Sequence, residues 1–107
     1  MLVISRGAGE AVMIGDDIVV WVDRVFDGVV AVRVTRSELR GRLTTTSFEG
    51  VLHTDESIDL GSGCRCQQTG TRGDRARMGF DVPKAMSIHR REVYEAIRRE
   101  QNRRRGA

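Results

Sequence analysis

The chain has 107 residues, of which 39% are hydrophobic and 5% aromatic, so it can form one small domain with a modest core. Its two cysteines, Cys64 and Cys66, stand one residue apart, which excludes a fold held together by disulfide bonds. No leader pattern opens the chain and no apolar run has the length of a membrane span, so we expect a soluble cytoplasmic protein with no membrane partner.

The formal net charge of +3 is unevenly distributed along the chain. Between residues 27 and 72, six arginines are balanced by six acidic residues, so the positive excess lies toward the two ends. Most of this excess comes from basic residues at Arg6, Lys84, Arg90, Arg91, Arg98, Arg99 and 103–105. The distribution favours a polyanionic partner bound by the ends. A solvated basic tail that aids solubility is the alternative, and charge alone does not separate the two.

The first third of the chain predicts antiparallel strands. Short apolar runs at residues 1–5 and 11–14 are separated by turns that contain glycine. Residues 17–26 form a longer strand that is apolar on both faces, so part of it should be covered on both sides. Asp27 and Gly28 then predict a hairpin turn, with residues 29–35 as the returning strand.

The pattern weakens between residues 36 and 72. We expect a short helical or turn segment near Ser37, a strand at 48–53, and a loose loop at 61–73 that is rich in Gly, Ser and Thr. Alternation returns at 74–80, and Pro83 marks the boundary before a strand at 84–89. A helix follows from residue 90 or 91 to about 101, with a narrow apolar stripe of Val93, Ala96 and Ile97. The basic tail at about 102–107 should fray.

The predicted last strand has an unusual composition. Met86, Ile88 and Arg90 lie on one face of an extended chain, and Ser87 and His89 lie on the other. An arginine beside two apolar residues suits an exposed ledge that packs bases and then binds them with a charge. The alternative for Met86 and Ile88 is ordinary core packing, and for His89 it is a packed position at the start of the helix.

Motifs near both ends make the chain similar to the carbon storage regulator family, the small bacterial regulators called CsrA or RsmA. The matching segments cover residues 1–26 and 73–100 and read MLVISR, GE, MIGDDIVVWV, GDRARMGFDVPK and IHRREVYEAI. The resemblance implies a mainly β fold of five short strands and a C-terminal helix, in an intertwined homodimer that pairs exposed strand edges. Within this single domain, 1–107, residues 27–72 would be an insertion, forming a β-hairpin arm or loop between the family's third and fourth strands. Residues 74–80 match the fourth strand better than 29–35.

The function that the resemblance implies is sequence-specific RNA binding, with no catalysis and no cofactor. Such a regulator binds GGA motifs in mRNA near the ribosome-binding site, or in small regulatory RNA, and represses translation or alters message stability. The RNA would bind where the first strand of one subunit lies beside the last strand of the other. The residues at the matching positions are Ile4, Arg6, Met86, Ser87, Ile88, His89 and Arg90. The chemistry is suitable, because edge-strand backbone can read single-stranded bases and arginine fits the acceptors of guanine.

Two departures from the family pattern affect the proposed site. Gly7 stands where a second basic residue is common, and Arg91 stands where an acidic residue is common. A different reading is a protein-interaction module with weak or altered RNA binding, whose insertion binds a partner such as a flagellar assembly factor-like antagonist. A metal-dependent enzyme is not favoured, because Cys64, Cys66 and His53 have no evident fourth ligand.

Overall fold

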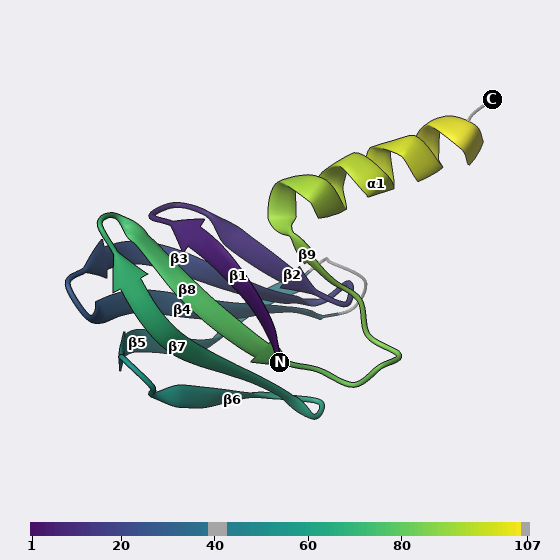
Figure 1. Ribbon diagram of the computed structural model, residues 1–107. Helices are drawn as coiled ribbons and strands as arrows, with labels where there is room; N and C mark the ends of the chain where they lie inside the picture. Colours follow the sequence, from purple (N-terminus) through teal and green to yellow (C-terminus); the bar gives the residue numbers. More distant parts are fainter. Residues whose placement is uncertain (39–42, 106–107) are drawn as a thin grey trace.

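Two antiparallel β-sheets and one helix make up the part of the chain that the computed structural model describes, residues 1–38 and 43–105 (Figure 1). One sheet has the strand order β1-β8-β7-β6 and the other has the order β5-β4-β3-β2-β9. The elements are β1 (Leu2–Gly7), β2 (Ala11–Ile14), β3 (Ile18–Phe26), β4 (Val29–Glu38), β5 (Leu43–His53), β6 (Ser57–Gly61), β7 (Cys64–Arg72), β8 (Arg75–Asp81), β9 (Ile88–Arg90) and α1 (Arg91–Arg105). The predicted fold class, mainly β with a C-terminal helix, is therefore confirmed.

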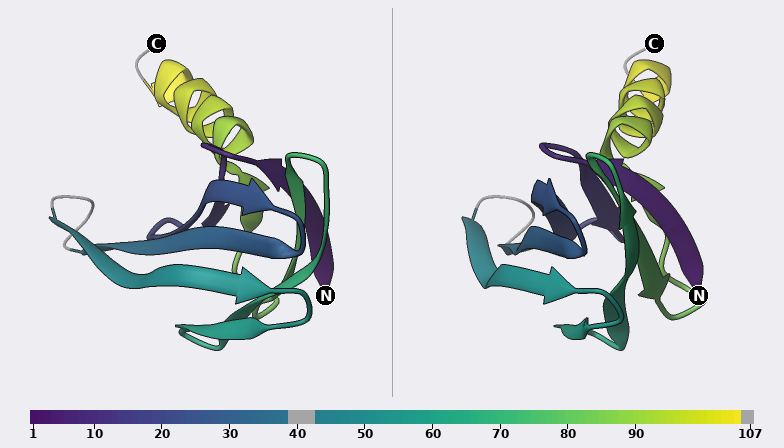
Figure 2. Two further views of the ribbon diagram at one scale, coloured as in Figure 1. Left: turned by 90° about the vertical axis from the view of Figure 1, so that its left-hand side faces the viewer. Right: turned by 60° about the vertical axis from the view of Figure 1, so that its left-hand side comes forward.

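The core lies between the two sheets, which form the layers seen in Figure 2. Strands β3 and β4 alternate buried and less buried positions, as the period-two sequence pattern predicts. The inward positions from both sheets include Ile18, Val20, Val22, Val30, Val32, Val34, Cys64, Cys66, Met78 and Phe80. The core therefore draws half of these side chains from the range that was predicted to be an insertion.

The predicted hairpin arm at residues 27–72 is not confirmed. Apart from 39–42, which lie outside the described residues, this range supplies strands β4 to β7. Val32, Leu52 and Cys66 are at most 3% exposed, so these strands belong to the core and do not project from it. The short helical or turn segment expected near Ser37 and the loose loop expected at 61–73 are both wrong, since they are parts of β4 and β7.

A buried glutamine explains why β7 was hard to recognise. Gln68 is fully buried on the inward face of the strand, where an apolar residue would have completed the alternation begun by Cys64 and Cys66. Its Nε2 donates hydrogen bonds to the carbonyls of Gly28 and Leu52, each at 3.2 Å. These bonds offset the cost of burying an amide and link β7 to two segments of the other sheet.

The helix α1 is attached to the sheets by its first turn. Glu92 accepts two hydrogen bonds from the Arg6 guanidinium, at 2.7 and 2.9 Å. The guanidinium of Arg91 lies over the Trp21 ring, 4.6 Å from its centroid. Beyond this turn the helix extends away from both sheets (Figure 1). A few polar and cation–π contacts, and no broad apolar interface, therefore set its direction.

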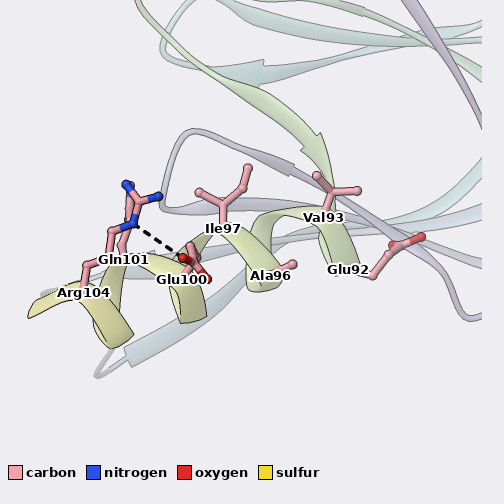
Figure 3. A pocket seen from close by; sticks show the side chains of 7 residues that line it. All are labelled: Glu92, Val93, Ala96, Ile97, Glu100, Gln101 and Arg104. Carbon is pink, nitrogen blue, oxygen red and sulfur yellow. Dashed lines mark ion pairs between the residues drawn. The ribbon is translucent and has the colours of Figure 1, made fainter. Parts of the chain in front are cut away.

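The distal part of α1 differs from the prediction in length and surroundings. The helix continues to Arg105, so the tail expected to fray from about residue 102 is helical up to that point, and Glu100 pairs there with Arg103 and Arg104. The predicted apolar stripe exists, but it faces outward, and Val93 and Ile97 are 42% and 39% exposed (Figure 3). Among the described residues, no helix is long and apolar enough to cross a membrane.

Replacing Leu52 by alanine should lower the free energy of unfolding by about 2 to 5 kcal/mol, because a core leucine leaves a cavity when it is truncated. Val51→Ala on the same strand is the matched control, since Val51 is 51% exposed. The control should change stability by less than about 0.5 kcal/mol. Chemical denaturation of both variants measures the difference, and equal small effects would restore the view of residues 27–72 as a peripheral arm.

Acid should release α1 from the sheets. The hydrogen bonds from Arg6 lower the pKa of Glu92 to about 2, from an ordinary value of 4.5. Because the pKa is depressed in the folded state, the stabilisation is fully present above pH 4.5 and is lost as the pH falls through about 2. Trp21 is the single tryptophan and contacts Arg91, so its fluorescence should change in this window.

Two carboxylate-to-amide variants test that assignment. Glu92→Gln should show the altered fluorescence already at neutral pH, whereas Glu100→Gln, farther along the helix, should behave as the unmodified chain does. A Glu92 carboxyl resonance that titrates near pH 4.5 in an NMR experiment would show that the ion pair with Arg6 is not formed in solution.

Candidate nucleic-acid interface

Most of the residues predicted to bind RNA lie on two edge strands, one from each sheet. β1 is the outer strand of the four-stranded sheet, and β9 is the outer strand of the five-stranded sheet. The ion pair between Arg6 on β1 and Glu92, which follows β9 by two residues, joins these edges. An edge strand leaves backbone donors and acceptors unpaired on its outer side. The prediction placed the first strand of one subunit beside the last strand of the other; in this structure the Arg6–Glu92 pair connects β1 to the segment after β9 of the same chain.

The two predicted residues on β1 are buried. Ile4 is 8% exposed and belongs to the core cluster, and Arg6 is 3% exposed. Besides Glu92, the Arg6 guanidinium bonds the carbonyl of Ala11 at 3.3 Å and pairs with Glu10 at 3.4 Å. The hydrogen bond with Glu92 and the negative charges of Glu10 and Glu92 raise the pKa of Arg6. The placement does not support direct phosphate binding by Arg6 and gives it the role of fixing the two edges together.

Met86 and Ile88 point toward the core. Both are partly buried and pack against the core cluster, and the Met86 sulfur lies 3.5 Å from Sγ of Cys64. The predicted exposed ledge is therefore corrected to an extension of the core at its rim. The alternation itself is as predicted, since Ser87 and His89 lie on the opposite side. The strand predicted at 84–89 is shorter and shifted, because only Ile88–Arg90 pairs with β2.

A polar recess of about 280 Å³ lies between β9 and the helix. Ser87 and His89 line it from the strand side, and Tyr94 and Arg98 line it from the helix. The Tyr94 hydroxyl donates a 2.9 Å hydrogen bond to Asp16, which fixes the ring at the wall of the recess. An aromatic ring, a guanidinium and an imidazole in one recess suit a planar polar ligand.

Arg90 is the predicted residue that the structure leaves available. It closes β9 opposite Val12 of β2, and its side chain is exposed. Lys84 is also exposed, in the segment that leads to β9. Both cations lie in or shortly before β9, so they add positive charge near this edge strand.

The glycine at position 7 has a local explanation. Its N–H donates a 2.6 Å hydrogen bond to Oε1 of Glu10, and a Cβ at this position would lie 3.1 Å from that oxygen. The Arg75 side chain from β8 comes close to the same place and donates hydrogen bonds to Ser5 through Nε and a terminal nitrogen, at 3.1 Å each. Arg75 thus supplies, from a neighbouring strand, a positive charge beside β1 that position 7 lacks.

Some contributors to the site were missed from the sequence. Glu92 lies 86 residues from Arg6, and the only sequence signal for it was an acidic residue in the first turn of a helix. Trp21 was noted only as a strand residue, yet its ring lies between the guanidinium groups of Arg33 and Arg91, at 4.9 and 4.6 Å. The basic residue at position 91, unusual against the family pattern, is thus explained by a cation–π contact.

The alternative metal site finds no support in the geometry. Cys64 and Cys66 are both buried, and burial raises the pKa of the Cys66 thiol to about 12, which disfavours the thiolate that binds metals. His53 is engaged with Glu56 at 2.6 Å. Within residues 1–38 and 43–105, no three potential metal ligands come together.

Comparison with known proteins identifies the second half of the chain. The model of the CsrA family, described as a global regulator protein family, matches residues 53–99. A translational regulator CsrA from Bacillus subtilis (strain 168) is 37% identical over 49 residues, which are 46% of this chain and 66% of the relative. A translational regulator CsrA from Rhodopirellula baltica is 40% identical over 45 residues, 42% of this chain and 64% of the relative. No solved structure matches.

The matched segment contains the β9 side of the interface and begins inside the range predicted to be an insertion. The chain spans just under two thirds of the length of each of these relatives. The segment runs from the end of β5 into α1, so it includes Arg90 and Glu92 but not Arg6. Over this segment the chain is similar to the CsrA family of global regulators.

Proposed function

We propose that this chain is a post-transcriptional regulator that binds RNA in a sequence-specific way. Its targets are GGA-containing sites in mRNA near the ribosome-binding site, and binding there represses translation or alters message stability. The observation that carries the proposal is the ion pair that connects edge strand β1 to the start of α1, directly after edge strand β9 and its exposed Arg90. The relatives described above are translational regulators, which agrees with this proposal.

The roles that we propose for the individual residues follow from how deeply their side chains are buried. Arg6 and Glu92 hold the two edges in place, and Met86 and Ile88 seat β9 on the core. The outer backbone of β1 and β9 then reads base edges, with Ser87 and His89 contributing from the recess. Arg90 binds guanine acceptors or a phosphate, and Lys84 adds positive charge. Cytoplasmic action on messages requires no cofactor in this scheme.

Replacing Arg90 by alanine should weaken binding of a hairpin with GGA in its loop by about 30-fold, on the order of 2 kcal/mol. The loss follows from removing an exposed, charged donor at the centre of the proposed interface. Gel-shift titration or fluorescence anisotropy with the labelled hairpin gives the dissociation constant. Equal affinity for GGA and scrambled loops would contradict sequence-specific recognition.

Arg24→Ala is the matched control, because Arg24 is also exposed but lies near the far end of β3. It should leave affinity for the hairpin nearly unchanged. Repeating both titrations at several salt concentrations separates two roles for Arg90. A phosphate contact predicts that Arg90→Ala reduces the salt slope by about 0.7, whereas a base contact predicts lost discrimination with an unchanged slope.

A further inference from the structure

The two sheets repeat one another with a constant shift of 46 residues. In one sheet Leu2 pairs with Phe80, and in the other Phe48 pairs with Val34. All six pairs between β1 and β8, from Leu2↔Phe80 to Gly7↔Arg75, have their counterparts between β5 and β4, from Phe48↔Val34 to His53↔Val29. We call strands β1 to β4 the first unit and strands β5 to β8 the second unit.

The inner hairpins obey the same shift, including their irregularities. Every pair between β3 and β4 from Val19↔Thr35 to Phe26↔Val29 recurs between β7 and β8, from Arg65↔Asp81 to Arg72↔Arg75. The register slips after Val22 in the first unit and after Gln68, its counterpart, in the second. A β-bulge at equivalent positions is a specific feature that an unrelated hairpin would not reproduce by chance.

The turn that follows the first strand of each unit is repeated in detail. Gly9 donates a backbone hydrogen bond to Val22 at 2.7 Å, and Asp55 donates one to Gln68 at 2.7 Å. The two residues share a left-handed conformation, with φ of 84° for Gly9 and 69° for Asp55. The non-glycine residue is in a strained region, and the repeated hydrogen bonds explain why the turn is kept.

Each unit gives its first strand to the other. β1 of the first unit pairs with β8 of the second, while β5 of the second pairs with β4 of the first. Such a reciprocal exchange of strands is the arrangement expected for an intertwined dimer, in which two identical chains would each supply one unit. Here both units lie in one chain, so the edges that a partner would pair are already paired.

The repeat is incomplete at one end. β9 and α1 follow the second unit and place β9 against β2 of the first. The positions 46 residues before β9 are 42–44, and of these Leu43 and Thr44 extend β5 against β4. Among the described residues, no strand covers the outer edge of β6, although its counterpart β2 is covered by β9. On one side of the molecule, which we call the β1/β9 edge, the first strand β1 is accompanied by the last strand β9 and the helix α1. On the other side, among the described residues, the first strand of the second unit, β5, has no such last strand or helix.

The side chains follow this asymmetry. Arg6 has Leu52 as its counterpart in the second unit, and both are buried, at 3% exposure each. The arginine is tolerated because α1 brings Glu92 to it, and the unit without a following helix has an apolar residue in its place. Likewise, Gly50 is the counterpart of Ile4. The Phe48 ring covers Gly50, and a Cβ added to Gly50 would lie 3.1 Å from that ring.

We propose that this chain is a one-chain equivalent of a strand-exchanged dimer, that it is monomeric, and that it presents one RNA-binding edge, at β1 and β9. Structurally equivalent halves thus supply different parts of a single site. The statement about RNA rests on the function proposed above, while the statement about assembly rests on strand pairing alone. This monomeric one-chain arrangement replaces the homodimer implied by the family resemblance.

The molar mass of the full chain in solution tests the assembly. Sedimentation equilibrium over a wide concentration range should give 12.0 kDa, and a mass of twice that value would overturn the one-chain arrangement. Native mass spectrometry with an excess of a GGA hairpin should then show one RNA per chain. Two RNAs per chain would overturn the single edge. If no RNA binds, the proposed function fails, and the mass alone still decides the assembly.

A matched pair of substitutions locates the edge. Ser5 on β1 and Val51 on β5 are counterparts, so Ser5→Glu and Val51→Glu place the same negative charge on the two edges. Ser5→Glu should weaken hairpin binding by about tenfold or more, and Val51→Glu should change it by less than about twofold. The reverse order, or equal losses, would contradict a single site at β1 and β9. Arg90→Ala gives a second, independent probe of that edge if Ser5→Glu impairs folding.

Discussion

The pairing of β1 with β8 is the interaction on which the rest of the molecule depends. It joins the start of the chain to a strand more than 70 residues later, and it closes one side of the four-stranded sheet. With β1 in this place, Arg6 reaches Glu92, and the first turn of α1 is fixed beside β9. Without that long-range pairing, neither the core between the sheets nor the meeting of the two edges could form.

The sequence predicted the regular strands well because their inward and outward residues differ clearly. Alternation of valine and isoleucine identified β3 and β4, and the turn at Gly28 was placed correctly, with a φ of 73°. β6 and β7 were missed because glycine and polar residues interrupt the pattern, above all Gln68 in the core. Its amide nitrogen donates to the carbonyls of Gly28 and Leu52 across the sandwich, contacts that the local sequence does not reveal.

The sequence motifs predicted a location for the candidate site, but not which of its side chains would be exposed. They predicted that the first and last strands lie side by side, and in the structure an ion pair connects Arg6 of β1 to Glu92, two residues after β9. Arg6 and Arg90 look alike in the sequence, but one is engaged by Glu92 and the other is open to solvent. That distinction arises from α1, whose direction depends on contacts between residues far apart in the chain.

When the strand exchange occurs within one chain, the stability of the exchanged state no longer depends on protein concentration. For two separate chains, the exchanged state is favoured by mass action and dissolves on dilution. With the link between β4 and β5 covalent, the second unit is always at a high effective concentration for the first, so the exchanged state survives dilution. The same link prevents subunits from being traded with a related protein, so the composition of the β1/β9 edge is set when the chain is made.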